Sequence, residues 1–155
     1  MLALIVALIC VNGLICVEYV EDSKGHLTFP ALPVDATSIT LQSNLISSVS
    51  LGDISAYTQL TNLDLKGNEL SAFPDLDPLK MTIEKLVLSS NDISFIDVNL
   101  ISKLERLSHL DLQDNEISSF PIVNGPPLAD LLLLQNPISK WPNLDGISET
   151  LVSLS

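Results

Sequence analysis

Apolar side chains recur along the chain in a spacing that fits neither a helix nor a strand alone. In residues 60–70, LTNLDLKGNEL, Leu63 and Leu65 alternate with polar residues as in a half-buried strand, whereas Leu60 and Leu70 leave that alternation. An asparagine, Asn68, stands inside the apolar run. A buried amide is tolerated where it hydrogen-bonds otherwise unpaired backbone groups. The spacing therefore predicts a short strand that ends in a sharp turn at the asparagine.

The same spacing occurs at five places in the chain. Their asparagines are separated by 24, 23, 24 and 21 residues, and they are Asn44, Asn68, Asn91, Asn115 and Asn136. A period of this length is typical of a solenoid, whose repeats bury their apolar residues against their neighbours. We therefore predict that these asparagines form a structural ladder with one member in each repeat.

The pattern LxxLxLxxNxL resembles the leucine-rich repeat superfamily, in particular its extracellular members, over about residues 36–155. The resemblance implies an α/β fold, a horseshoe-shaped solenoid with a parallel β-sheet on its concave face. Its convex face would carry mostly extended, 3₁₀ or short helical segments. Phe73–Pro74, Phe120–Pro121 and Trp141–Pro142 fit such backs, because the residue before proline is pushed out of helical geometry. Residues 95–110, by contrast, have a helical spacing of apolar positions.

The two ends of the chain differ from the repeats. Residues 1–17 are apolar and uncharged, which predicts a signal peptide cleaved after Gly13 or Cys16; a signal anchor or a buried capping segment is the alternative. Residues 18–36 are expected to form an entry or cap segment, and residues 37–155 the repeat domain. That domain has five repeats and the start of a sixth, truncated one, because Leu151 and Leu154 follow Leu128 and Leu131 by 23 residues.

Charge and cysteine content narrow the range of partners and compartments. The 19 acidic and 7 basic residues give a net charge of −12, which argues against nucleic acid and anionic membranes as partners. Solubility alone explains this acidity, or else it attracts a basic protein. Both cysteines, Cys10 and Cys16, lie in the expected signal peptide. The disulfide-bonded caps usual in the extracellular family are therefore not expected, which leaves a cytosolic location open.

No group of residues predicts catalysis. The two histidines, His26 and His109, have no cysteine or glutamate at metal-ligand spacing. Asp75 and Asp77 lie between prolines and match no calcium loop, so a solvated turn is expected there. We therefore expect no enzyme activity, no catalytic residue, no cofactor and no metal.

The resemblance implies that a protein ligand binds the concave face of a secreted or cell-surface protein. The outward-pointing residues expected to bind it are Asp64, Lys66, Val87, Ser89, Asp111, Gln113, Leu132 and Leu134. Leu132 and Leu134 place two leucines on a face that is normally wet, either as an apolar hot spot or because C-terminal sequence beyond residue 155 covers them. A structural or matrix spacer remains an alternative function, as does a cytosolic scaffold if the N-terminal apolar run is not a signal. Whether a membrane anchor follows residue 155 stays open.

Overall fold

The structure is a computed structural model that describes residues 34–49, 54–120 and 125–139 in full. For the strands at 6–11, 15–20 and 153–154 it describes the backbone alone. The expected entry segment at 18–36 and the Trp141–Pro142 turn lie mostly or wholly outside these residues. Among the described residues, no helix is long and apolar enough to cross a membrane.

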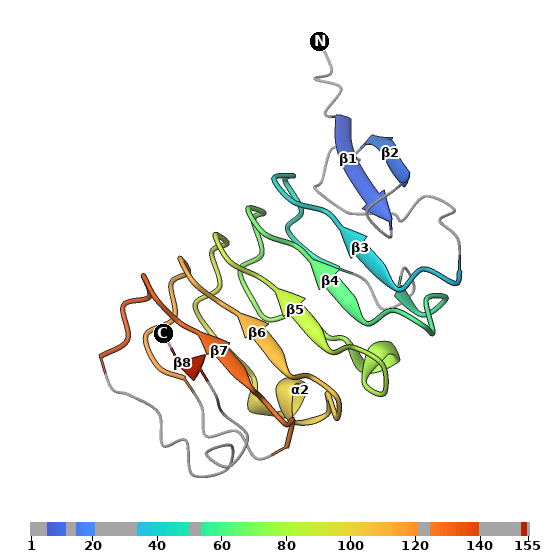
Figure 1. Cartoon of the computed structure of the whole chain (residues 1–155). Helices are drawn as coiled ribbons and strands as arrows, with labels where there is room; N and C mark the ends of the chain where they lie inside the picture. Colours follow the sequence, from blue (N-terminus) through green and yellow to red (C-terminus); the bar gives the residue numbers. More distant parts are fainter. Residues whose placement is uncertain are drawn as a thin grey trace.

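Short parallel strands, one from each repeat, stack into a solenoid (Figure 1). They are β3 (Ser38–Thr40), β4 (Asn62–Asp64), β5 (Lys85–Val87), β6 (His109–Asp111), β7 (Asp130–Leu132) and β8 (Ser153–Leu154). Each pairs in parallel with the next in chain order, so that one repeat forms one coil of the solenoid. Leu131 pairs with Leu154, the register that their 23-residue separation predicts. The parallel-sheet solenoid predicted from the repeat spacing is thus confirmed.

The N-terminal apolar run forms a hairpin at the other end of the stack. Strands β1 (Val6–Val11) and β2 (Ile15–Val20) pair antiparallel with each other, and β1 also pairs antiparallel with β3. The sheet therefore has eight strands in the order β2-β1-β3-β4-β5-β6-β7-β8.

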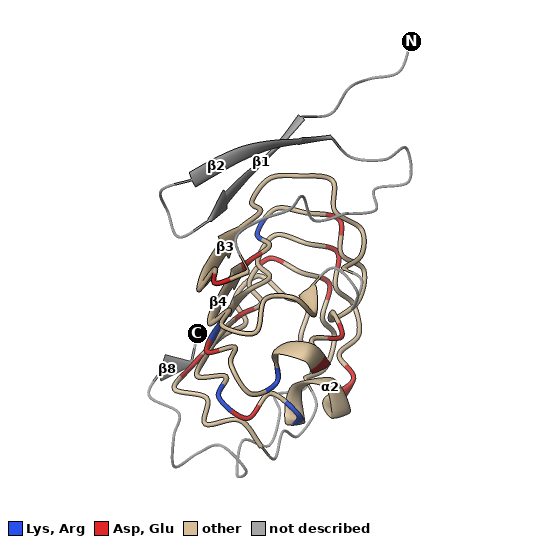
Figure 2. Cartoon of the chain, turned by 90° about the vertical axis from the view of Figure 1, so that its right-hand side faces the viewer, with Lys and Arg blue, Asp and Glu red and all other residues tan. Residues whose placement is uncertain are grey.

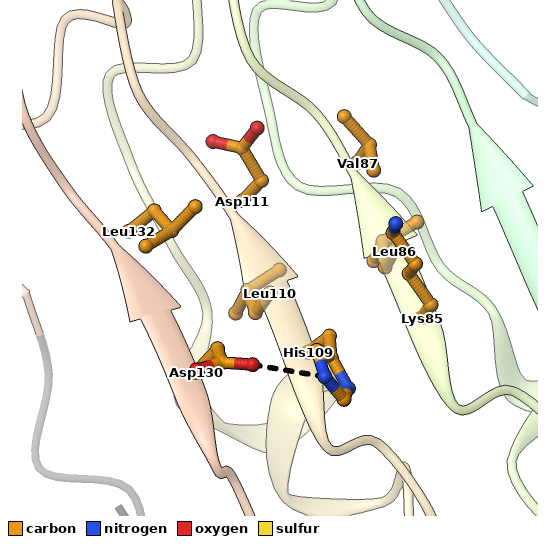
Figure 3. Close-up of a pocket in the computed structure, with 8 residues that line it drawn as sticks. All are labelled: Lys85, Leu86, Val87, His109, Leu110, Asp111, Asp130 and Leu132. Carbon is orange, nitrogen blue, oxygen red and sulfur yellow. Dashed lines mark ion pairs between the residues drawn. The ribbon is translucent and has the colours of Figure 1, made fainter. Parts of the chain in front are cut away.

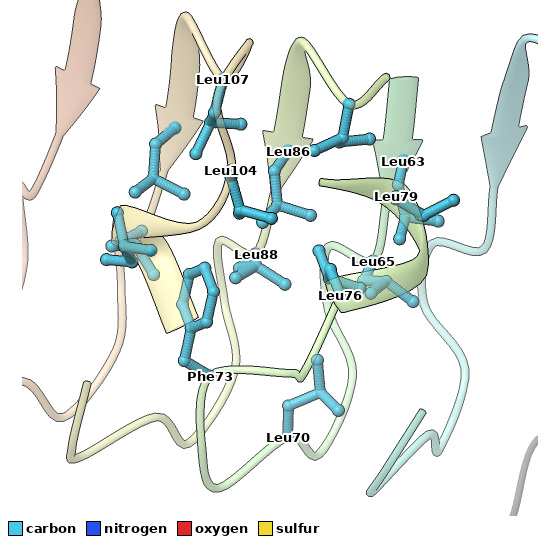
Figure 4. Packing of buried hydrophobic residues seen from close by; sticks show 14 of the residues in the cluster. Leu63, Leu65, Leu70, Phe73, Leu76, Leu79, Leu86, Leu88, Leu104 and Leu107 are labelled. Atoms are coloured by element: carbon cyan, nitrogen blue, oxygen red, sulfur yellow. The ribbon is translucent and has the colours of Figure 1, made fainter. Parts of the chain in front are cut away.

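The core lies behind the sheet and is built mainly from leucine and isoleucine. The central residue of each strand from β3 to β7 is buried, and so is the residue just after each strand, such as Leu65 and Leu88. Later in the second, third and fourth coils another aliphatic residue and a bulky one return to the core, for example Leu70 and Phe73 (Figure 4). Because each coil supplies only a thin layer of these side chains, the core is continuous across coils and no coil is stable by itself.

The asparagines join each coil to the one before it. In the third coil, Asn91 Nδ2 donates to Leu88 O at 3.0 Å in its own coil and to Leu65 O at 3.1 Å in the preceding coil. Asn91 Oδ1 accepts from Leu70 N, also in the preceding coil, at 3.1 Å. The same three contacts recur at Asn68, Asn115 and Asn136. Each of these side chains therefore satisfies backbone groups on both sides of a junction between coils.

The residue before each asparagine makes the turn in the left-handed region. These residues are Ser43, Gly67, Ser90, Asp114 and Gln135, with φ between 54° and 69°. Such a conformation costs a non-glycine residue roughly 1–2 kcal/mol, and only one of the five is glycine. In the first four, the N–H donates to a carbonyl of the next coil, as from Gly67 N to Ser89 O at 2.9 Å. We infer that these bonds between coils hold the strained turn in place.

The backs of the coils are mostly irregular. The Pro-containing back of the second coil forms a 3₁₀ turn, η1 (Asp77–Leu79), consistent with the expectation for such backs. The helical spacing of residues 95–110 yields only one short helix, α2 (Val98–Ser102), which Asp97 caps by accepting from Asn99 N at 2.9 Å. Beyond it, Leu104 and Leu107 are buried through tighter turns, with N–H groups bonded three residues back. The period of the pattern was right, but the short coil returns to the sheet before a longer helix forms.

Candidate functional site

The outer face of the sheet, which points away from the core, gathers most of the residues predicted to bind a ligand. Three columns of side chains cross it. The first is Ser38, Asn62, Lys85, His109 and Asp130; the second is Thr40, Asp64, Val87, Asp111 and Leu132; the third is Gln42, Lys66, Ser89, Gln113 and Leu134. We use "outer face" for these columns throughout. Because successive side chains of a strand point to opposite faces, the first two columns point away from the side on which the central residue is buried.

The second column brings four of the predicted residues side by side. Strand register places Asp64 beside Val87, Val87 beside Asp111, and Asp111 beside Leu132. All four side chains are half-buried. Acidic and aliphatic groups therefore alternate from strand to strand at a spacing of about 4.8 Å.

Both aspartates of this column are held by local hydrogen bonds. Asp64 Oδ1 accepts from Lys66 N, and Asp111 Oδ1 accepts from Gln113 N, each at 3.0 Å. Gln113 Nε2 also donates to Asp111 Oδ1 at 3.2 Å, whereas the side chain of Gln42 donates to the second oxygen of Asp64. Asp111 therefore keeps one carboxylate oxygen without a hydrogen bond among the described residues, in a fixed orientation.

The third column mixes exposed and buried side chains. Leu134 is 54% exposed, whereas Leu132, two residues earlier in the second column, is half-buried. Ser89 is only 4% exposed, and its hydroxyl has no hydrogen-bond partner among the described residues. It is the smallest side chain of its column. The structure thus buries Ser89, and its contact with a ligand stays a prediction.

The first column was missed as a site by the sequence analysis. His109 Nε2 lies 2.8 Å from Asp130 Oδ2 in the neighbouring strand, an ion pair whenever the imidazole is protonated (Figure 3). Lys85 stands on the other side of His109 in the same column. Each of these three residues comes two positions before a predicted outward residue. Side chains two residues apart in a strand point to the same side, so the second column would have been enough to predict them.

A serine hydroxyl lies beside the histidine of this ion pair. Ser108 Oγ lies 2.8 Å from His109 Nδ1 and donates to Glu84 O at 3.2 Å. An acyl-transfer site also needs free N–H groups to stabilise an oxyanion. The amides of Ser108 and His109 both donate to Glu84 O, and those of Ala129 and Asp130 both donate to Ser108 O. These four amides donate within the sheet and are therefore not free to stabilise an oxyanion.

Charged groups on the outer face differ from those elsewhere in the fold. Acidic positions are spread over the coils with few basic positions between them (Figure 2). Of the described lysines and arginines, Lys80, Lys103 and Arg106 each form an ion pair away from the outer face. Lys66 and Lys85, both on the outer face, take part in none of the ion pairs of the described residues. In the described part of the chain, no three His, Cys, Asp or Glu side chains are grouped so that they could hold a metal ion.

Comparison with known proteins does not assign the chain to a family. No protein-family model matches the sequence, and no curated protein matches it.

Proposed function

We propose that the chain is a non-enzymatic protein–protein interaction module of the leucine-rich repeat superfamily, similar to secreted or cell-surface members. The ligand binds the outer face, which is the concave face of the horseshoe in that family. The recurring LxxLxLxxNxL spacing, the parallel strands and the asparagine contacts support the family assignment. The binding function rests on one observation above all. Among the described residues, the outer face carries charged side chains that take part in no ion pair, such as Lys66 and Asp111, and a leucine, Leu134, that is 54% exposed.

The chemistry of the outer face supports a ligand with basic and apolar groups. Asp64 and Asp111 present carboxylates that no cation neutralises in the described ion pairs. Leu134 lies one coil beyond Asp111, is 54% exposed and adds apolar area to the same face. Apolar contacts at the centre of an interface supply most affinity, while surrounding charge steers the partner and sets its orientation. The net charge of −12 acts in the same direction by attracting basic proteins.

Site-specific photo-crosslinking tests this function. A benzoylphenylalanine at Lys66, which is exposed on the outer face, should yield a crosslinked protein in cells that express the chain. The same residue at Ser94, which is exposed beyond the asparagine turn, is the control and should yield none. Equal crosslinking from both positions would contradict a ligand on the outer face. No crosslinked protein from either position would favour a structural or matrix spacer.

The proposed location is extracellular, and it depends on the N-terminal run being a signal peptide. Expressed in a eukaryotic cell, the protein should enter the secretory pathway and be cleaved after Gly13 or Cys16. A second candidate, a cytosolic scaffold, is favoured by the pairing of β1 with β3, which makes the same run a cap on the solenoid. N-terminal sequencing separates the two. A cytosolic product that keeps Leu2 contradicts secretion and supports the scaffold.

A further inference from the structure

Two neighbouring hollows on the outer face follow each other across the sheet, and we call the two together the trough. One, of about 300 Å³, is lined by residues of β5, β6 and β7 (Figure 3), and the other, of about 180 Å³, by residues of β3, β4 and β5. Both include Lys85 and Val87, so they meet at β5. The first column of the outer face forms one wall and the second column forms the other. The trough therefore runs across five strands, along the solenoid axis.

The dimensions of the trough select an extended occupant. Its walls are two residues apart along each strand, about 7 Å, which is narrower than the 10–12 Å diameter of an α-helix with its side chains. Strand addition is also excluded within β4–β6, because each of these strands is already paired on both sides. At about 4.8 Å per strand the trough is roughly 19 Å long, enough for about six extended residues.

The walls define the chemistry of that occupant. Asp111 has a carboxylate oxygen free of hydrogen bonds among the described residues and takes part in none of their ion pairs, whereas Asp130 is matched by His109. Val87 and Leu132 flank Asp111 on the same wall, so that the aliphatic stem of a lysine or arginine can pack beside them while its charge reaches the carboxylate. Lys85, on the opposite wall, can donate to carbonyl groups. An extended segment lying across the strands has such carbonyls unpaired.

We propose that the trough binds an extended segment of a protein partner, with a lysine or arginine on Asp111 and an aliphatic residue against Leu132. Lys85 donates to the backbone carbonyls of the segment. This inference rests on the proposed function, since it names the part of the partner that the outer face would recognise.

Selection from a displayed library of random ten-residue peptides on the purified whole chain tests the proposal. Enriched peptides should share a lysine or arginine within three residues of an aliphatic residue. Asp111→Asn, which keeps the Oδ1 acceptor for Gln113, should weaken the best peptide by about tenfold or more, as expected for a hydrogen bond to a charged group. Lys85→Met and Leu132→Ser should each weaken it several-fold. Asp114→Asn removes the same charge from an exposed turn outside the trough and should leave the affinity unchanged.

The outcomes separate this inference from the proposed function. No enrichment, or enriched peptides whose affinity is the same for Asp111→Asn and the unaltered protein, would overturn the trough as a peptide site. If crosslinking from Lys66 still captured a protein in that case, the outer face would bind a folded surface instead. If both experiments failed, the proposed function would fall together with the inference.

Discussion

At the scale of single residues, the asparagine and the residue before it determine how one coil attaches to the next. The asparagine supplies hydrogen bonds across the junction, and the left-handed residue before it turns the chain so that those bonds can form. The sequence spacing predicted a buried asparagine at the end of each strand. It did not predict the left-handed residue, because Ser, Gly, Asp and Gln fill that position and share no side-chain property. The geometry comes from the backbone bonds between coils, which composition does not reveal.

Replacing a ladder asparagine should destabilise the fold according to the number of coils that it joins. Asn91→Ala removes contacts to two coils and should cost about 1–3 kcal/mol, since buried backbone groups lose their partners. Among the described residues, Asn44 donates only to Leu41 O and Gln42 O of its own coil, so Asn44→Ala should cost less. Asn62, exposed in β4, is the control, and its change to alanine should cost within about 0.5 kcal/mol. Denaturant midpoints measure all three; equal costs at Asn91 and Asn62 would contradict the ladder.

Glycine and serine at the left-handed position should respond in opposite directions. In Gly67→Ala the new Cβ would meet Ser43 Oγ at 3.4 Å, an ordinary contact, so the loss of about 1 kcal/mol would come from backbone strain at φ +69°. Ser90→Gly relieves the corresponding strain at φ 56° and should stabilise the protein by up to about 1 kcal/mol, reduced by the added freedom of glycine in the unfolded chain. Thermal unfolding of both variants checks the pair. A stabilising Gly67→Ala would show that the turn does not need a left-handed residue.

At the scale of elements, the sequence predicted the positions of the strands. For the backs of the coils it predicted the type of structure but not where each turn or helix begins and ends. Each strand follows from the pair of buried residues that brackets an outward one, such as Leu63 and Leu65 around Asp64. The one-turn helix α2 and the 3₁₀ turn η1 depend on how much chain remains to cross the back before the next strand begins. Contacts between successive backs, such as that of Gly125 with Ser102, are invisible in a repeat pattern aligned on leucines.

Gly125 tests that contact between backs. A Cβ on Gly125 would lie 2.8 Å from Ser102 O, at the end of α2, so that either the helix end or the Gly125 backbone must move. Gly125→Ala should therefore cost about 1–3 kcal/mol, the usual range for overpacking. Hydrogen exchange should locate the loss at α2 and the chain entering β7. If Gly125→Ala lowered the free energy of unfolding by less than Gly67→Ala does, the contact between Gly125 and Ser102 would not be tightly packed.

At the scale of the whole molecule, the solenoid separates residues that hold the fold from residues that are available for binding. Most of the buried side chains are leucines and isoleucines, and the ladder asparagines lie at the junctions between coils. The outer face repeats only the alternation of outward positions. For that reason the sequence could predict Asp64, Val87, Asp111 and Leu132 as neighbours. It could not predict the pairing of His109 with Asp130 or the trough, because both depend on side chains from adjacent coils. Nor did it predict the burial of Ser89.

If the outer face binds a protein as proposed, binding should be separable from the stability of the fold. The most direct test compares Leu134→Asp with Met81→Asp. Leu134 on the outer face is 54% exposed and Met81 on the back of the solenoid is 53% exposed, so both changes should leave the melting temperature nearly unaltered. Titration with the partner captured by crosslinking should show a loss of on the order of 2 kcal/mol in binding free energy for Leu134→Asp and little change for Met81→Asp. Equal affinities of the two variants for that partner would contradict binding at the outer face.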